Sequence, residues 1–221
     1  MLASVDGKIS TGGNDERDVD KDLPKVDGVR EGLHQYYEIE KRTDVYSLNT
    51  GRVMAKIGIN ARKNEPKKMP VSFIIIDNKP HLNKNGVFYL TKWVKKLYLV
   101  TTNKNHPAYK IKADNVEIIY YNGKINFKDL FAKLRNKYKI QKITIQSGGT
   151  LNSTFIREGL IDRLSIVVAP CVIGGRNSST IADGKDIMTE KDLKQIKAVK
   201  LKKAEVLKKS YLHLQYNVIN K

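Results

Sequence analysis

Several features that would assign this 221-residue chain to particular classes are missing. It has one cysteine, Cys171, which excludes an internal disulfide and fits a reducing compartment. Its four histidines are scattered without the spacing of metal ligands, so we expect no zinc or haem site. No stretch approaches the ~20 apolar residues of a membrane span. The N-terminus lacks a basic segment followed by an apolar one. We therefore expect a soluble, cytoplasmic protein without a signal peptide or a membrane partner.

Basic residues exceed acidic ones, with 41 Lys+Arg against 23 Asp+Glu and a formal net charge of +18. Such an excess raises the hypothesis of a nucleic-acid partner. The excess is mostly lysine, however, spread from Lys8 to Lys221, and no basic ribbon interleaved with aromatic residues is present. We therefore do not expect nucleic acid as a partner; steeply salt-dependent DNA binding would be needed to support it. The charge instead favours anionic ligands such as phosphorylated cofactors.

Apolar runs of strand length alternate with segments of helical periodicity. We expect strands at 45–48, 71–76, 97–100, 116–120, 143–145 and 164–169. We expect helices at 29–42, at 127–138 behind an Asn126 cap, and from about 150 to Gly159. Two β-rich runs, 196–207 and 210–219, end the chain, and residues 10–32 are expected to form a long loop. This order predicts one α/β domain over residues 1–221, with a central, mostly parallel sheet flanked by helices and an antiparallel C-terminal hairpin.

Ligands of a parallel sheet bind beyond the carboxyl ends of its strands, so the segments that follow strands are the candidate sites. The strongest runs from Ser147 through Gly148, Gly149, Thr150 and Leu151 to Asn152 and opens a helix. Adjacent glycines let the backbone approach a ligand, and the helix start offers N–H groups to a pyrophosphate. It is neither a Walker loop nor a Gly-x-Gly-x-x-Gly fingerprint. Taken alone, this segment is more often a plain connection between a strand and a helix.

A second candidate is the opening segment, Met1 to Ile9, in which Asp6–Gly7 is a turn pair after a short strand. By itself it would be a hairpin turn with a solvated lysine. Together and in this order, however, the two segments resemble the motifs of the riboflavin-biosynthesis reductases, the C-terminal domain of the bifunctional deaminase-reductase. The similarity extends over nearly the whole chain, through the segments 14–17, 77–78, 158–162, 169–170 and 174–175.

The resemblance implies a dihydrofolate-reductase-like fold, NADPH as the cofactor and a homodimer. The family reaction reduces a ribosylamino-pyrimidine phosphate by hydride transfer from the nicotinamide to the first carbon of the opened ribose. Such an enzyme must hold the two carbons roughly 3–3.5 Å apart and exclude water. No covalent nucleophile and no metal is required.

The resemblance also implies residue roles. The expected cofactor-binding residues are Leu2 and Ala3 at the nicotinamide, Gly148, Gly149, Thr150, Leu151 and Asn152 at the pyrophosphate, Asn78 and Thr101 at the adenosine, and Arg52 and Val53 in the intervening loop. The expected substrate-binding residues are Ser4, Glu16, Lys56 and Gln146. Lys8 is the candidate catalytic residue, either binding the substrate phosphate or moving a proton; a merely solvated side chain is the alternative. Lys79 is available for the 2′-phosphate of the cofactor, although this does not decide between NADPH and NADH.

The chain departs from the family pattern in the segment 49–62, expected to be a loop that contacts cofactor and substrate. Arg52 stands where the family has threonine, Lys56–Ile57 replaces an acidic pair, and Gln146 replaces a glutamate. Asp18 occupies a position that is often tryptophan, and only three residues precede Ser4, so the first strand is short or begins upstream. The more positive pocket leaves two alternatives open: a reductase of a different pterin- or pyrimidine-like substrate, or a cofactor-binding protein without turnover.

Overall fold

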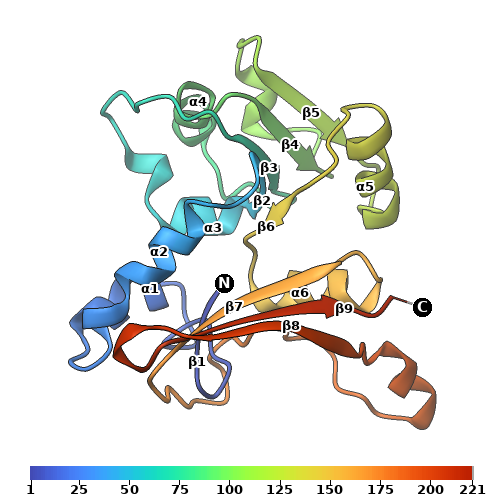
Figure 1. The fold of residues 1–221 in the computed structure, drawn as a ribbon. Coiled ribbons are helices and arrows are strands. Elements are labelled where there is room, and N and C mark those ends of the chain that lie inside the picture. Colours follow the sequence, from blue (N-terminus) through green and yellow to red (C-terminus); the bar gives the residue numbers. More distant parts are fainter. Residues whose placement is uncertain (221) are drawn as a thin grey trace. The chain divides into compact units, whose positions relative to one another are not determined.

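The computed structural model describes residues 1–220, which form two compact units (Figure 1). The first unit combines residues 1–42 with the chain from Gly148 onward, and the second unit is the continuous segment Thr43–Ser147. The second unit is therefore inserted into the sequence of the first. The expectation of one domain over residues 1–221 stays a prediction. No helix within residues 1–220 has both the length and the apolar character needed to cross a membrane.

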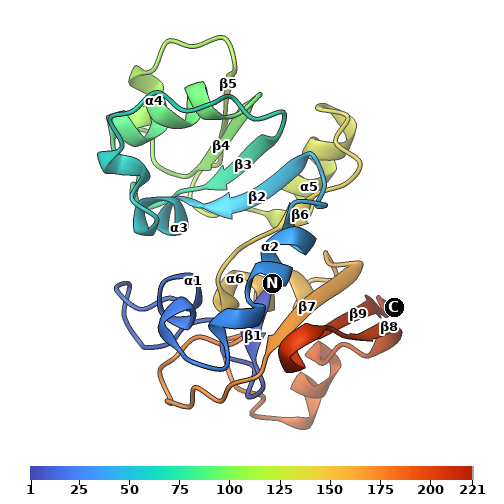
Figure 2. The same cartoon turned by 60° about the vertical axis from the view of Figure 1, so that its left-hand side comes forward.

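A five-stranded parallel sheet forms the second unit, in the order β5-β4-β3-β2-β6 (Figure 2). Its strands are β2 (Tyr46–Thr50), β3 (Ser72–Ile76), β4 (Leu97–Thr101), β5 (Val116–Tyr120) and β6 (Thr144–Ile145). Every neighbouring pair is parallel. All residues of β3 and β4 are buried, as their continuous apolar runs predict. The five strands expected from the sequence are thus confirmed.

The helices of the second unit are α3 (Gly51–Lys56), α4 (Lys84–Trp93) and α5 (Phe127–Asn136), with the 3₁₀ turns η3 (Ile59–Ala61) and η4 (Pro107–Lys110). Asn126 caps α5 by accepting the Asp129 amide, as predicted. The segment 49–62 is not a loop as expected: Thr50 caps α3 through the Val53 amide, and η3 follows. Helix α4 was not predicted from the sequence. Its apolar face joins the core of the unit, with Leu90, Leu97 and Leu99 fully buried.

A four-stranded sheet forms the first unit, in the order β1-β7-β9-β8. Its strands are β1 (Leu2–Ser4), β7 (Arg163–Ala169), β8 (Val199–Val206) and β9 (Leu212–Val218). Strand β1 runs parallel to β7, whereas β9 is antiparallel to both β7 and β8. The predicted C-terminal hairpin is confirmed, with Val206 paired to Leu212 beside its turn.

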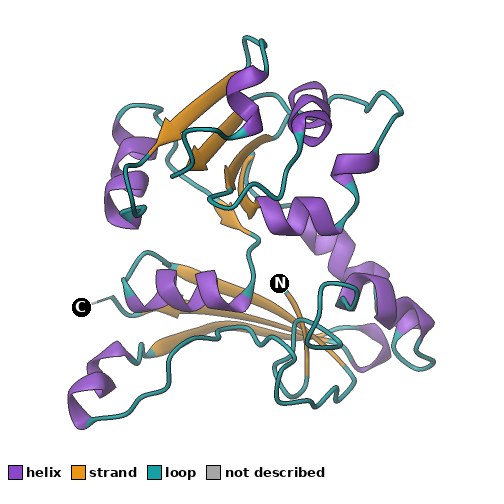
Figure 3. Cartoon of the chain, turned by 180° about the vertical axis from the view of Figure 1, so that it is seen from behind, coloured by secondary structure: helices purple, strands orange, loops and turns teal. Residues whose placement is uncertain are grey.

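The helices of the first unit are α1 (Val19–Asp22), α2 (His34–Glu40) and α6 (Gly149–Arg157), with the 3₁₀ turns η1 (Leu23–Lys25), η2 (Arg30–Gly32), η5 (Glu190–Gln195) and η6 (Lys208–Ser210). Figure 3 shows α6 lying against the sheet of this unit. Residues 10–32 are less irregular than expected, because α1, η1 and η2 lie within them. Buried Leu23, Val29 and Leu33 from this segment pack with Tyr211, whose hydroxyl donates to the Val29 carbonyl at 2.7 Å.

Candidate functional site

The turn before α6 lies in the first unit, and its two glycines have different surroundings. Gly148 is the N-cap of α6; it is exposed, and a side chain added there would meet no atom within 4 Å. Gly149 is buried, and a Cβ added there would lie 2.3 Å from both an Asp183 carboxylate oxygen and the Thr180 carbonyl oxygen. Gly149 is therefore required by the packing of the protein's own chain.

The loop 180–183 covers Gly149 through several hydrogen bonds. The Asp183 amide donates to the Gly149 carbonyl at 3.0 Å, and the Asn152 side chain donates to the Ile181 carbonyl at 3.0 Å. The Asp183 carboxylate accepts the Thr180 amide and hydroxyl at 2.9 and 2.7 Å. A carboxylate beside the start of a helix is stabilised by the helix dipole. We expected a ligand to approach the backbone closely at Gly149, but the loop 180–183 makes this approach. The hydrogen bond to the same loop explains why Asn152 is buried.

The open side of the turn still has the chemistry that a phosphate needs. Gly148 and Thr150 are exposed, Leu151 is half-buried, and the first N–H groups of a helix have no acceptor within the helix. Backbone donors at the positive end of the dipole suit a phosphate oxygen. The residues around Gly148 and Thr150 therefore fit the diphosphate of a dinucleotide, whereas the Asp183 carboxylate disfavours an anion on the Gly149 side.

The motif Ser4–Lys8 forms a closed turn after β1 in the first unit. The Gly7 amide donates to the Ser4 carbonyl, and Gly7 has a φ of +74°, which favours glycine. The Lys8 ammonium donates to the Ser178 carbonyl at 3.0 Å, and its side chain is half-buried. Lys8 is therefore held by the backbone of a second loop, which argues against the solvated-lysine interpretation.

Asp6 joins this turn to the loop that follows β7. Its carboxylate accepts the Ser4 hydroxyl and the amides of Ile173 and Gly174, the latter two at 3.1 and 2.7 Å. The Ser4 hydroxyl and these two amides lower the pKa of Asp6 to about 2. The sequence motif Asp6–Gly7 predicted the turn but did not reveal that Asp6 anchors a segment more than 160 residues later.

Other predicted residues of the first unit contact the protein's own chain. The Leu2 side chain, 3% exposed, packs in the core with Val167 and Ala169, so it is the backbone of β1 rather than this side chain that could border a nicotinamide. Ala3 and Ser4 are also buried. Glu16 is exposed in a turn whose Asn14 side chain accepts the Glu16 amide.

The predicted residues of the second unit gather at one edge of its sheet. Because β6, β2, β3 and β4 are parallel neighbours, the residues after them lie side by side at the carboxyl edge. These residues are Gln146 after β6, Arg52 and Val53 in the first turn of α3, Asn78 after β3, and Thr101 at the end of β4. The strand order thus brings these residues to one edge, and their roles at a ligand stay predictions.

Hydrogen bonds order this edge. The Gln146 amide donates to the Leu48 carbonyl, and the Gln146 side-chain oxygen accepts the Ser47 hydroxyl at 2.9 Å. Asn78 is exposed, and its side-chain oxygen accepts the Thr102 amide at 3.1 Å. Thr101 is fully buried, and its hydroxyl donates to the Asp77 carbonyl at 2.8 Å. Thr101 therefore orders the edge rather than offering its side chain to a ligand.

Asp77 lies at the centre of this edge, a role that the sequence did not reveal. Its carboxylate accepts His106 Nε2, His81 Nδ1 and the amides of His81 and Leu82, all at 3.0–3.1 Å. Burial would raise the pKa of Asp77, but the hydrogen bonds from His106, the Leu82 amide and His81 outweigh this effect and lower it. A Cβ on Gly51 would lie 2.2 Å from this carboxylate, so α3 begins with glycine for lack of space.

Arg52 and Lys56 project from α3, the helix that replaces the expected loop. Arg52 is exposed and Lys56 half-buried, so the charges that distinguish this chain from the family pattern are accessible. Within residues 1–220, no group of three or more His, Cys, Asp or Glu side chains could hold a metal ion.

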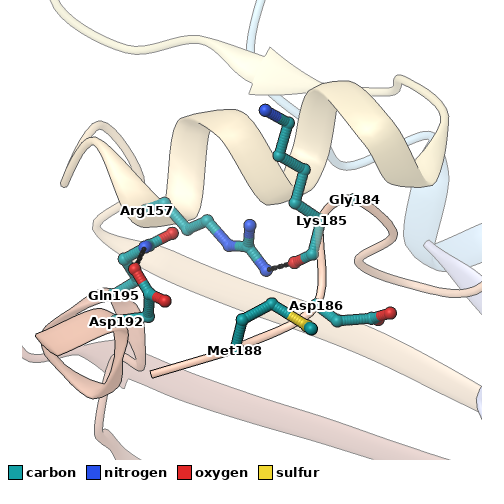
Figure 4. Close-up of a pocket in the computed structure, with 7 residues that line it drawn as sticks. All are labelled: Arg157, Gly184, Lys185, Asp186, Met188, Asp192 and Gln195. Atoms are coloured by element: carbon teal, nitrogen blue, oxygen red, sulfur yellow. Dashed lines mark hydrogen bonds between the residues drawn. The ribbon is translucent and has the colours of Figure 1, made fainter. Parts of the chain in front are cut away.

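A hollow of about 500 Å³ lies in the first unit at the C-terminal half of α6 (Figure 4). It is lined by Arg157, Gly184, Lys185, Asp186, Met188, Asp192 and Gln195. The Arg157 guanidinium donates to the Lys185 carbonyl at 2.7 Å, and both cationic and anionic side chains surround the space. None of the predicted site residues lines it, and its mixed charge selects no ligand.

Solved structures identify the class of fold. The chain matches RibD of Acinetobacter baumannii with a TM-score of 0.68 and 16% identity, over 100% of this chain and 57% of that one. It matches the riboflavin biosynthesis reductase Rib7 of Saccharomyces cerevisiae with a TM-score of 0.59 and 18% identity, over 99% of this chain and 87% of that one. The predicted dihydrofolate-reductase-like α/β fold is confirmed.

Comparison of the sequence with models of protein families identifies the family. Residues 1–212 match the RibD C-terminal domain, and the chain belongs to this family. Riboflavin biosynthesis protein RibD of Actinobacillus pleuropneumoniae is 24% identical over 98% of this chain, which spans 55% of that protein. The 2,5-diamino-6-ribosylamino-4(3H)-pyrimidinone 5′-phosphate reductase of Methanothermobacter thermautotrophicus is 35% identical over 48 residues, 22% of each chain. The matches thus cover about half or less of these relatives' length.

Proposed function

We propose that this protein is an NADPH-dependent reductase of a phosphorylated ribosylamino-pyrimidine, as the names of its relatives indicate. The observation that carries the proposal is the open, amide-lined start of α6 at Gly148 and Thr150, within a chain that matches the family over residues 1–212. The family's two motifs stand on the elements that such an enzyme needs: a helix start for the diphosphate and a fixed turn after β1.

The chain's own residues divide the work. In the first unit, the amides of Gly148 and Thr150 suit the diphosphate of the cofactor. In the second unit, taken by itself, Asn78 at the carboxyl edge of the sheet suits an adenosine. Lys8 of the first unit, fixed by the Ser178 carbonyl, is suited to hold a substrate phosphate or to move a proton. Gln146 is the polar side chain that the second unit offers to a substrate. NADPH, when bound, supplies the hydride. Catalysis then consists of positioning and exclusion of water rather than of covalent chemistry.

The charges of α3 favour a second candidate, a reductase of a different and more anionic pterin- or pyrimidine-like substrate. Arg52 and Lys56 add two cations where the family pattern has neutral or acidic residues. A phosphate or carboxylate group on the substrate would be stabilised by them. This candidate shares the cofactor and differs only in the acceptor.

The test measures cofactor binding and turnover separately. NADPH is titrated by quenching of the fluorescence of Trp93. Its consumption is followed in the near ultraviolet with the diaminopyrimidinone ribosyl phosphate and with a dihydropterin that carries phosphate groups. Binding with turnover of the first substrate supports the first candidate, and turnover of only the dihydropterin supports the second. Binding without turnover identifies a cofactor-binding protein. Absence of NADPH binding at millimolar concentration, with steeply salt-dependent DNA binding, refutes the reductase.

We further propose that the protein is cytoplasmic and acts as a homodimer. Exposed apolar side chains gather on the C-terminal hairpin and support a second copy as the partner: Val199 (42%), Leu201 (53%), Val206 (83%) and Leu212 (37%). Val199 and Leu201 lie near one end of the hairpin and Val206 pairs with Leu212 at the other, and a second copy would remove these apolar side chains from water. In light scattering with size-exclusion chromatography, Leu201→Lys should give a monomer and Val45→Lys, at an exposed position of the second unit, a dimer. A monomeric unmodified protein refutes the dimer.

A further inference from the structure

His106 is a fully buried histidine to which the proposed reaction assigns no role. Its Nδ1 accepts the Ala108 amide at 3.1 Å, and its Nε2 lies 3.0 Å from Asp77 Oδ2. A ring nitrogen that accepts an N–H carries no proton, so the network assigns His106 as the neutral tautomer that donates from Nε2. His106 therefore joins two segments through opposite edges of its ring: the start of η4 and the end of β3.

Asp77 and His106 together form what we name the Asp77–His106 clasp. Asp77 is 1% exposed, and its carboxylate receives four donors, three of which come from residues 81 and 82 and one from His106. No buried side-chain nitrogen or oxygen in residues 1–220 lacks a partner. A buried charge is tolerated only when it is fully hydrogen-bonded, so removing one donor perturbs every segment that shares the carboxylate.

The clasp fixes the spacing between two loops at the carboxyl edge, 77–82 and 101–106. Around it, the Asp77 amide donates to the Val100 carbonyl, the Thr101 hydroxyl to the Asp77 carbonyl, and the Thr102 amide to the Asn78 side chain. The last bond engages Asn78 Oδ1 and thereby orients the exposed Asn78 Nδ2 amide away from Thr102. The buried hydrogen bonds of the clasp thus hold the exposed donor of Asn78 in one orientation.

We propose that Asp77 and His106 are positioning residues that preorganise Asn78 and the 101–106 loop for the adenosine half of the dinucleotide. The inference rests on the proposed function, since it assumes that this edge meets the cofactor. Preorganisation strengthens binding because fewer groups lose freedom when the ligand arrives. The clasp therefore acts on cofactor affinity, at the adenosine end alone, and not on hydride transfer.

Two matched substitutions at position 106 separate positioning from packing. His106→Gln retains a terminal N–H donor for Asp77 but loses the acceptor for the Ala108 amide. His106→Asn retains an acceptor near the Nδ1 position but loses the donor to Asp77. The probes are 2′,5′-ADP for the adenosine half and reduced nicotinamide mononucleotide for the other half, with affinity measured by calorimetry and thermal melting measured alongside.

We expect His106→Asn to weaken 2′,5′-ADP binding about tenfold, the loss that matches one hydrogen bond of ordinary strength. Its affinity for reduced nicotinamide mononucleotide and its kcat with saturating NADPH should stay within about twofold. His106→Gln should retain most of the 2′,5′-ADP affinity even if its melting temperature falls. Equal weakening of both halves, or unchanged 2′,5′-ADP binding by folded His106→Asn, overturns the inference.

One further variant and the binding data of the unmodified protein keep the outcomes separate. If His106→Asn does not fold, Thr101→Val removes the hydroxyl bond to the Asp77 carbonyl at nearly constant volume and should weaken 2′,5′-ADP binding selectively. Unchanged binding in that variant also overturns the inference. If the unmodified protein binds NADPH and only the variants behave unexpectedly, the clasp fails and the reductase stands. If the unmodified protein binds neither NADPH nor 2′,5′-ADP, the proposed function itself fails.

Discussion

Alanine substitutions at the two adjacent glycines of the α6 turn should have opposite consequences. At Gly149 the new Cβ would lie 2.3 Å from the Thr180 carbonyl oxygen and from an Asp183 carboxylate oxygen, about 1 Å closer than a carbon and an oxygen approach without repulsion. At Gly148 the new Cβ would meet no atom within 4 Å, and the φ of −75° is allowed for alanine.

The expected magnitudes follow from these contacts. Overpacking a tight site costs about 1–3 kcal/mol. We expect the upper half of that range for Gly149→Ala, because one of the two clashing groups is backbone and cannot rotate away. Since a chain of this size loses roughly 2–4 °C in melting temperature per kcal/mol, Gly149→Ala should melt about 5–10 °C lower. Gly148→Ala should cost only about 0.5–1 kcal/mol, the difference between glycine and alanine at an N-cap.

Ligand binding should show the reverse order. Gly148 lies on the open side of the turn, so its added methyl group occupies space that the diphosphate would use. We expect Gly148→Ala to bind NADPH about tenfold more weakly, a loss of about 1.4 kcal/mol, while Gly149→Ala retains affinity at temperatures where it is folded. The assays are thermal and urea unfolding for stability and fluorescence titration for NADPH.

Two results would refute this reasoning. Equal destabilisation by the two variants would show that the loop 180–183 does not cover Gly149 as the geometry requires. Unchanged NADPH affinity in Gly148→Ala, with normal binding by the unmodified protein, would place the diphosphate elsewhere.

Two further predictions concern the first unit. Because the pKa of Asp6 is lowered from 3.8 to about 2, its stabilising contribution is present above pH 4 and is lost as the pH falls towards 2. In urea unfolding, Asp6→Asn should therefore be less stable than the unmodified protein at neutral pH and equally stable near pH 2. An NMR titration that gives the Asp6 carboxyl group a midpoint near pH 4 would contradict this. Tyr211→Phe removes the buried hydrogen bond to the Val29 carbonyl and should cost about 1–2 kcal/mol in the same assay, whereas no loss would show that the hydroxyl is not satisfied there.

The buried strands were predictable because a strand that is buried on both faces consists of a continuous run of apolar residues. β3 and β4 are continuous apolar runs. β9 was predicted from its alternating sequence, although His213 is the buried residue and Leu212 is exposed. The cap of α5 was predictable because an Asn immediately before an amphipathic run is a local signal. These elements depend on neighbours within a few residues, which a single sequence displays.

Helix α4 was missed because its sequence conflicts with its structure locally. Gly86 lies inside the helix, where glycine is unfavourable, and only the contact with Asn60 explains it: a Cβ there would lie 2.2 Å from the Asn60 side-chain oxygen. The segment 49–62, which departs from the family pattern, was likewise expected to be a loop, although Thr50 provides an ordinary N-cap for α3.

In the candidate site too, features that depend on neighbouring residues were predictable, and features that depend on residues far along the sequence were not. The Gly148–Gly149 turn and the polar residues after β3 and β4 could be found because they follow strands. The partners that decide their roles could not: Asp183 lies 34 residues after Gly149, and His106 lies 29 residues after Asp77. The fold decides which of these distant residues come together, so the residue pattern alone predicted a candidate site after the strands but not which glycine or carboxylate contacts the protein's own chain.

The inserted arrangement of the two units has a consequence for synthesis on the ribosome. Residues 43–147 form a continuous unit that can fold as soon as they have emerged, whereas Leu2–Ser4 pair with residues 167–169 and β9 closes at residue 218. At about 5–20 residues per second, the first strand waits roughly 10–40 s for the end of its own sheet. During that interval the segment 1–42, with its apolar residues Leu23, Val29 and Leu33 uncovered, is the part of this unit that a chaperone would bind.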